Sequence, residues 1–277
     1  MDAHRSFDTG EVILSYTESP PTGPPMVLLH GLTARKELWT SLLPFFTPRW
    51  QVYALDLRGH GVSGRVASRY HLTDYARDVV AFLAHLPTPA VVMGHSLGAA
   101  TALAVAAACP TGTRAAVLLD PPLFNRNTGV AAMPAVQDWF RWVYQVVTTS
   151  SSFEQIVARC RESDPTATQE QIRVFADTVS GVAADAVATV LEDRLFAGVD
   201  LARTLRRIQC PLLLLHGDWD HGAAMRDDDA AFVREALPSA AIGKIPDGSH
   251  MFFQEQQEQV LQHIAEFAAS LPTLGAR

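Results

Sequence analysis

The sequence has little cysteine, with three in 277 residues. Cys109, Cys160 and Cys210 are an odd number at wide spacing, so they indicate neither a disulfide framework nor a metal site. A low cysteine content with no pairing pattern is typical of proteins in the reducing cytoplasm. We therefore expect three buried, unpaired thiols, no bound metal and a cytoplasmic location.

The chain also lacks basic blocks and a long uninterrupted apolar run. Its 22 Lys and Arg residues face 29 Asp and Glu residues, for a formal net charge of −7, and a nucleic-acid partner requires a clustered basic face. The first eight residues contain no apolar stretch of a signal peptide. The most apolar segment, 91–109, is interrupted by His95, Ser96 and two glycines, which favours a buried helix over a membrane span. The expected partner is a small molecule.

With 48% hydrophobic and 18% charged residues, the composition predicts one large globular α/β domain carrying an insertion. Apolar runs predict strands, and residues at helical spacing predict helices between them. The predicted strands are 11–16, 26–30, 51–57, 90–93, 114–120, 211–216 and 240–245, and the predicted helices are 37–46, 72–86, 99–107, 228–237 and 255–271. This alternation indicates parallel pairing through crossover helices.

One long stretch breaks the alternation. Residues 122–207 contain no convincing strand pattern, and their apolar residues recur at helical spacing. We predict a helical cap inserted over the carboxyl edge of the sheet, with a core built from residues 1–121 and 208–277. The aromatic residues of the cap are the candidates for lining a substrate pocket or for packing the cap onto the sheet, and Trp139, Trp142 and Phe196 are the predicted pocket residues.

The segment Gly94-His95-Ser96-Leu97-Gly98 lies between a predicted strand and a helix of small residues. A serine on such a sharp turn presents its hydroxyl at the top of the sheet. The flanking glycines let strand and helix pass closely, and the free N–H groups of the helix start face the same region. Ser96 is the predicted nucleophile.

A serine hydroxyl needs a base and a carboxylate that orients it. His250 follows the last strand and precedes the final helix, at the edge where Ser96 lies, and is the predicted base. Three aspartates are candidates for the carboxylate. The chain order Ser…Asp…His is a known one. We favour Asp220, because a residue three past Gly217 can turn back toward the histidine loop, whereas Asp218 is placed to cap the turn; Asp120, at the end of the strand after the serine helix, and Asp218 stay open.

Acyl transfer also needs donors for the developing oxyanion. The backbone N–H of Leu97 starts the serine helix, and that of Leu32 lies in the loop after the first buried strand. We predict these two N–H groups as the oxyanion hole.

Taken together, these motifs resemble the α/β-hydrolase superfamily. The resemblance rests on His30-Gly31-Leu32, on Asp56-Leu57-Arg58-Gly59-His60-Gly61-Val62-Ser63, on the turn at Ser96, on Gly217-Asp218-Trp219-Asp220, and on Gly248-Ser249-His250. It implies an eight-stranded, mostly parallel sheet flanked by helices, with a helical cap. It also implies Ser96, Asp220 and His250 as the catalytic residues, and a structural role for the segment from Asp56 to Ser63.

The expected activity is that of a carboxylesterase-like serine hydrolase working through an acyl-enzyme, with no cofactor because the triad supplies nucleophile, base and oxyanion donors. Lactones, and carbon–carbon bonds of ring-cleavage products, are alternative substrates within the same superfamily. A ligand-binding receptor that keeps the fold without turnover is the alternative from another class. The sequence does not indicate an oligomeric state.

Overall fold

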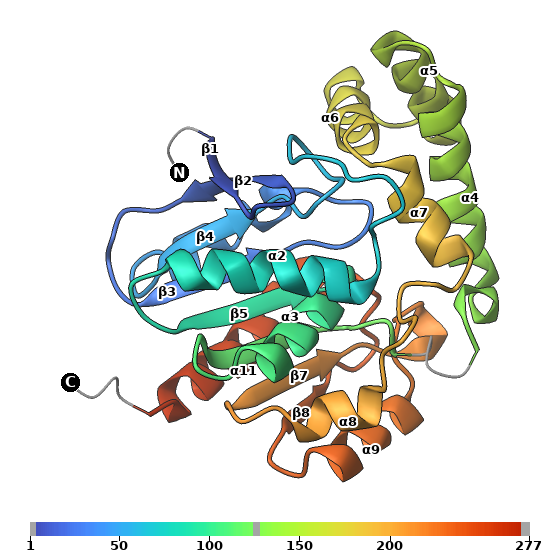
Figure 1. The fold of residues 1–277 in the computed structure, drawn as a ribbon. Helices are drawn as coiled ribbons and strands as arrows, with labels where there is room; N and C mark the ends of the chain where they lie inside the picture. The colour runs from blue at the N-terminus through green and yellow to red at the C-terminus, as the bar shows by residue number, and fades with distance from the viewer. Residues whose placement is uncertain (1–3, 124–127, 273–277) are drawn as a thin grey trace.

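The computed structural model describes residues 4–123 and 128–272. Its centre is one sheet in the order β1-β2-β4-β3-β5-β6-β7-β8, with helices on both faces (Figure 1). The strands are β1 (Arg5–Asp8), β2 (Ile13–Glu18), β3 (Pro25–Leu29), β4 (Gln51–Leu55), β5 (Ala90–His95), β6 (Thr113–Leu119), β7 (Leu212–His216) and β8 (Ala241–Lys244). β2 pairs antiparallel with β1 and β4, and all other neighbours are parallel. The predicted fold class is confirmed.

The parallel strands in the middle of the sheet are buried along their whole length, because helices cover both faces. This burial explains their uninterrupted apolar sequences. The helices are α1 (Leu43–Phe46), α2 (Leu72–His85), α3 (Leu97–Ala108), α4 (Pro134–Thr149), α5 (Phe153–Ser163), α6 (Gln169–Ser180), α7 (Ala184–Leu191), α8 (Leu201–Arg206), α9 (Asp227–Ala236), α10 (Phe252–Glu255) and α11 (Gln257–Ser270), with short 3-10 turns η1 (Lys36–Trp39), η3 (Val130–Ala132) and η4 (Trp219–His221).

Two separate apolar layers hold the sheet. One contains the inner faces of α2, α3, α8 and α9, and the other contains those of α1, α10 and α11. Figure 1 shows α2 and α3 in front of the strands and α11 behind them. The parallel strands therefore end at one common edge, where the loops after β3, β5, β6 and β7 meet.

The helix expected over residues 37–46 is wrong, and the structure has η1 and α1 there instead. Pro44 explains the break. In a continuous helix it could not donate to the carbonyl of Thr40, and its ring would clash with that carbonyl; as it stands, Pro44 occupies the first turn of α1. Strand β1 had no sequence signal, because its four residues are largely exposed on a sheet edge.

Helices α4 to α7 stand to one side of the sheet and share an apolar cluster of their own (Figure 1). Helix α8 also falls within the expected insertion, 122–207, but it packs on α3 and α9 of the core. The division into core and cap stays a prediction, and this packing favours a second boundary before Leu201.

No single helix in the described part of the chain is long and apolar enough to cross a membrane. Helices α6 and α7, which meet at an angle of 77°, would together have the length and the apolar composition of a membrane span.

Arg58 is the largest charged side chain of the interior and is completely buried. Its guanidinium donates to both carboxylate oxygens of Asp78 at 2.6 Å, to Glu11 at 2.7 Å, and to the backbone carbonyl of Arg69. These bonds join the loop after β4 to helix α2 and to the segment before β2. The structural role predicted for this loop agrees with these contacts.

Replacing Arg58 with Ala leaves the buried carboxylate of Asp78 without its partner. We expect the free energy of unfolding, measured by urea denaturation, to fall by about 3–5 kcal/mol. Arg141, whose 3.2 Å ion pair with Asp138 is exposed, is the control, and Arg141→Ala should change it by less than about 1 kcal/mol. Equal losses in the two variants would contradict the structural role of Arg58.

Candidate active site

Ser96 lies between β5 and α3 with φ 54° and ψ −118°. This conformation is strained for a residue with a side chain, at a cost of about 1–3 kcal/mol. The residues two positions before and after Ser96 must be glycine. A Cβ on Gly94 would come within 2.1 Å of the Gly98 carbonyl oxygen, and a Cβ on Gly98 would come within 2.1 Å of the Leu29 carbonyl oxygen. The close approach of β5, α3 and β3 thus forces the turn that carries Ser96.

His250 lies in the loop after β8, and its Nδ1 is 2.6 Å from Oδ2 of Asp120. Since a carboxylate only accepts, Nδ1–H is the donor, and this bond leaves Nε2 of a neutral ring with a free lone pair. Asp120 directly follows β6, is completely buried, and has φ 49°. Its Oδ2 also accepts from the backbone N–H of Ala224 at 2.7 Å.

The structure corrects the choice of carboxylate: Asp120 contacts His250, whereas the favoured candidate, Asp220, lies exposed in η4. The physical reason is the strand order. β6 is the immediate neighbour of β5, so a residue that ends β6 lies beside the Ser96 turn, while η4 follows β7, one strand farther away. The chain order Ser…Asp…His does not distinguish the two aspartates, because Asp120 also lies between Ser96 and His250. The sequence prediction relied on the position of Asp220 in its turn and did not use the adjacency of the strands.

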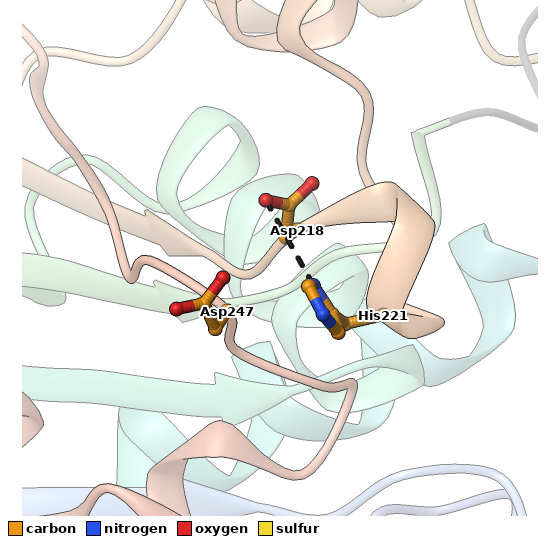
Figure 2. A group of neighbouring side chains, drawn as sticks. All are labelled: Asp218, His221 and Asp247. Carbon is orange, nitrogen blue, oxygen red and sulfur yellow. Dashed lines mark ion pairs between the residues drawn. The ribbon is translucent and has the colours of Figure 1, made fainter.

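Asp218, the third candidate, closes the turn after β7. Its backbone carbonyl accepts from His221 and Ala223. Its carboxylate lies near His221 and Asp247, and the three side chains point toward one another on neighbouring loops (Figure 2). The three could hold a cation, but Nζ of Lys244 lies 3.7 Å from Asp218 Oδ1 and supplies positive charge there.

His95 supports the loop that carries His250. Its Nε2–H donates to the backbone carbonyl of His250 at 2.9 Å, and the two rings lie 4.4 Å apart between centroids. Burial, followed by the neighbouring His250, holds the pKa of His95 well below its usual value. A neutral His95 therefore packs beside His250 without adding positive charge.

The loop after β3 lies directly over the serine turn. A Cβ on Gly31 would come within 3.3 Å of the Ser96 Cβ. The carbonyl of the next residue, Leu32, accepts from His60 Nε2 at 2.5 Å, and His30 bonds to the carbonyl of Gly31 at 2.7 Å through Nδ1. Two buried histidines thus orient the peptides around Leu32.

A cavity of about 640 Å³ opens at this edge of the sheet, between the core loops and the cap. Ser96, His250, Leu32 and Leu97 all line it, so the structure brings the predicted nucleophile, base and oxyanion residues together. The lining continues over apolar residues of the core and cap, among them Leu38, Pro122, Met133, Val136, Phe140, Val190, Leu195 and Met251.

Of the three predicted pocket residues, only Trp139 lines the cavity. Trp142 does not line the cavity, and its ring stacks on those of Trp139, at 5.1 Å between centroids, and Phe175. Phe196 does not line the cavity either, and it packs against the apolar layer of the core. Helical spacing identified an aromatic face, but only the packing of the cap decided which ring meets the cavity.

Sequence reasoning missed the polar ties between cap and core at this cavity. Arg35, in the loop after Leu32, donates to Glu37 at 2.6 Å and pairs with Asp177 of α6. Nε1–H of Trp139 donates to the Thr33 hydroxyl at 3.4 Å. No motif could have revealed the Arg35–Asp177 and Trp139–Thr33 contacts, because each joins residues more than 100 positions apart in the chain.

Comparison with known proteins identifies related sequences and a shared fold. The sequence profile of the alpha/beta hydrolase family matches residues 26–263. The chain is 27% identical over 231 residues to N-formylmaleamate deformylase of Pseudomonas putida, covering 83% of this chain and 82% of the relative. It is 28% identical over 254 residues to pimeloyl-[acyl-carrier protein] methyl ester esterase of Xanthomonas axonopodis pv. citri, and the match covers 90% of this chain and 97% of the relative. The crystal structure of E-2-(acetamidomethylene)succinate hydrolase superposes with a TM-score of 0.75 at 24% identity, covering 97% and 99%, and shows the same fold.

His30 makes the stability of this site depend on pH. Burial, followed by the neighbouring His60, lowers the pKa of His30 to about 3, against about 6.5 when unfolded. As pH falls from 6.5 toward 3, the unfolded chain takes up a proton that the folded chain excludes. We expect this residue to lower the free energy of unfolding by up to about 1.4 kcal/mol per pH unit in that window.

Urea denaturation between pH 7 and 4 checks this. The His30→Gln variant should show a shallower loss of stability toward acid than the wild type, while the same change at the exposed His4 should leave the slope as it was. An unchanged slope in His30→Gln would contradict the neutral, buried state of His30.

Proposed function

Because this chain belongs to the alpha/beta hydrolase family, we propose that it is a serine hydrolase that cleaves small carboxylic esters through an acyl-enzyme. The observation that carries the proposal is the 2.6 Å bond from His250 Nδ1 to Asp120, beside a cavity that Ser96 also lines. Together, the bond and the cavity place an oriented imidazole and a serine on a strained turn at one site.

In the proposed reaction, His250 Nε2 takes the proton of the Ser96 hydroxyl as its oxygen attacks the substrate carbonyl carbon. Asp120 holds the ring in the required tautomer and stabilises the imidazolium that forms. His250 then returns the proton to the leaving alkoxide, which departs as the alcohol. A water molecule, deprotonated by the same Nε2, attacks the carbonyl carbon of the acyl-enzyme. The bond to the Ser96 oxygen then breaks, this oxygen takes the proton back from Nε2, and the acid is released.

The backbone N–H groups of Leu32 and Leu97 are the proposed donors to the oxyanion. Leu97 begins α3, so its N–H has no partner within the helix. The peptide around Leu32 is held by His60 through the Leu32 carbonyl. Each such donor is worth about 3–4 kcal/mol of transition-state stabilisation.

An ester is the favoured substrate because the alkoxide leaving group is easily protonated and expelled. Support comes from relatives of similar length: one is named a methyl ester esterase and another a deformylase. Lactones present the same carbonyl chemistry and belong in the same assay.

The proposal includes a cytoplasmic location, supported by unpaired cysteines among the described residues, although Cys109 is only half-buried rather than buried as expected.

Replacing Ser96 with Ala removes the proposed nucleophile. We expect hydrolysis of p-nitrophenyl butyrate to fall by at least roughly 10⁴-fold, and a fluorophosphonate probe to label native wild type but neither Ser96→Ala nor denatured wild type. Equal ester hydrolysis by wild type and Ser96→Ala would remove the proposal.

The two aspartates distinguish the structural assignment from the sequence-based one. Asp120→Asn should lower kcat by roughly 10⁴-fold, because the amide leaves His250 in the wrong tautomer. Asp220→Asn, on the exposed η4, should keep kcat within about twofold. The reverse order of the two kcat values would return the role of the acid to Asp220. Circular dichroism of both variants controls for folding.

A further inference from the structure

The charges around the cavity are few and unevenly placed. Among the lining residues that the structure describes, the two histidines aside, Arg35 is the only cation, and Glu37 and Asp177 are the only anions. All three lie at the junction of the core loop and α6, and all are partly exposed. The rest of the lining is mainly apolar.

Arg35 is already occupied by carboxylates of the protein itself. Its Nε donates to Glu37 at 2.6 Å, and its Nη1 contacts Asp177. These two partners hold the pKa of Arg35 above its ordinary value, the Glu37 hydrogen bond contributing most. Lys36 Nζ also lies 3.7 Å from Glu37 Oε1, but it donates to the buried Asp56 at 2.5 Å. Counting Lys36 with Asp56, the described groups at this end of the cavity are two cations and three anions, a net negative charge.

A substrate with its own carboxylate would meet two obstacles here. It would have to displace Glu37 or Asp177 to reach Arg35, and the displaced anion would stay close by and repel it. Deeper in the cavity, its charge would lose water against apolar side chains without gaining a cationic partner among the described lining residues. A neutral acyl chain faces neither cost and gains from apolar contact.

We infer that Asp177 and Glu37 act as specificity-determining residues, which mask Arg35 and restrict the site to neutral, apolar acyl groups. The inference rests on the proposed function, because it treats this cavity as the substrate site. Asp177 comes from the cap and Glu37 from the core, so the mask forms only when α6 lies over the loop after β3.

Binding is measured separately from turnover, by isothermal titration calorimetry on the Ser96→Ala protein. The probes are ethyl hexanoate and monoethyl adipate, which differ by a terminal methyl against a carboxylate. We expect the neutral ester to bind at least about tenfold more tightly, which corresponds to about 1.4 kcal/mol.

Removing a carboxylate that pairs with Arg35 should reduce the difference in affinity between ethyl hexanoate and monoethyl adipate. In the Ser96→Ala background, Asp177→Asn should improve binding of monoethyl adipate about tenfold and change that of ethyl hexanoate less than about twofold. A further Arg35→Gln change should abolish the gain. Asp138→Asn, which removes an exposed cap carboxylate away from the cavity, is the matched control, and Glu37→Gln is a second unmasking variant that keeps the tie between core and cap.

Three results would overturn the inference: equal or tighter binding of monoethyl adipate by the Ser96→Ala protein, no response to either unmasking change, or an equal response to Asp138→Asn. Failure of the proposed function is a different result, in which wild type and Ser96→Ala hydrolyse esters equally. The two failures are distinguishable because the calorimetric comparison needs no turnover.

Discussion

The bond between Asp120 and His250 depends on the order of the strands. Asp120 and His250 are 130 residues apart in the chain, and they meet because β6 lies beside β5 and the loop after β8 crosses back over that edge. The carboxylate is buried and accepts from Ala224 and His250 through the same oxygen. Any shift of β6 against β5 would separate the imidazole from its orienting group, so the site requires the sheet to keep its register.

Around this bond, the protein uses buried neutral histidines as hydrogen-bonding parts of the backbone scaffold. His30 and His60 orient the loop that contains Leu32, and His95 holds the carbonyl of His250. Burial depresses the pKa of all three. His95, the ring that packs against His250, can lie there without competing with it for protons, and the lowered pKa of His30 reduces the stability of the fold in acid.

The cap contributes a different constraint. Its helices have their own apolar cluster, and their polar ties to the core at the cavity are the Arg35–Asp177 pair and the contact of Trp139 with Thr33. The cavity therefore has walls from both the core and the cap, whose apolar clusters meet through residues of α4 and α7. The chemistry is held by the sheet, while the charge and shape that a substrate meets are set where the cap joins the core.

The sequence by itself determined the parts that are local. Apolar runs identified the buried strands, two glycines around Ser96 identified the tight turn, and the apolar period of 122–207 predicted helices where the structure has α4 to α8, because each depends on residues near one another in the chain. Only the tertiary structure decided which aspartate faces His250, which tryptophan meets the cavity and which carboxylates cover Arg35. Those contacts depend on strand order and helix packing between distant segments, and neither is expressed in the spacing of neighbouring residues.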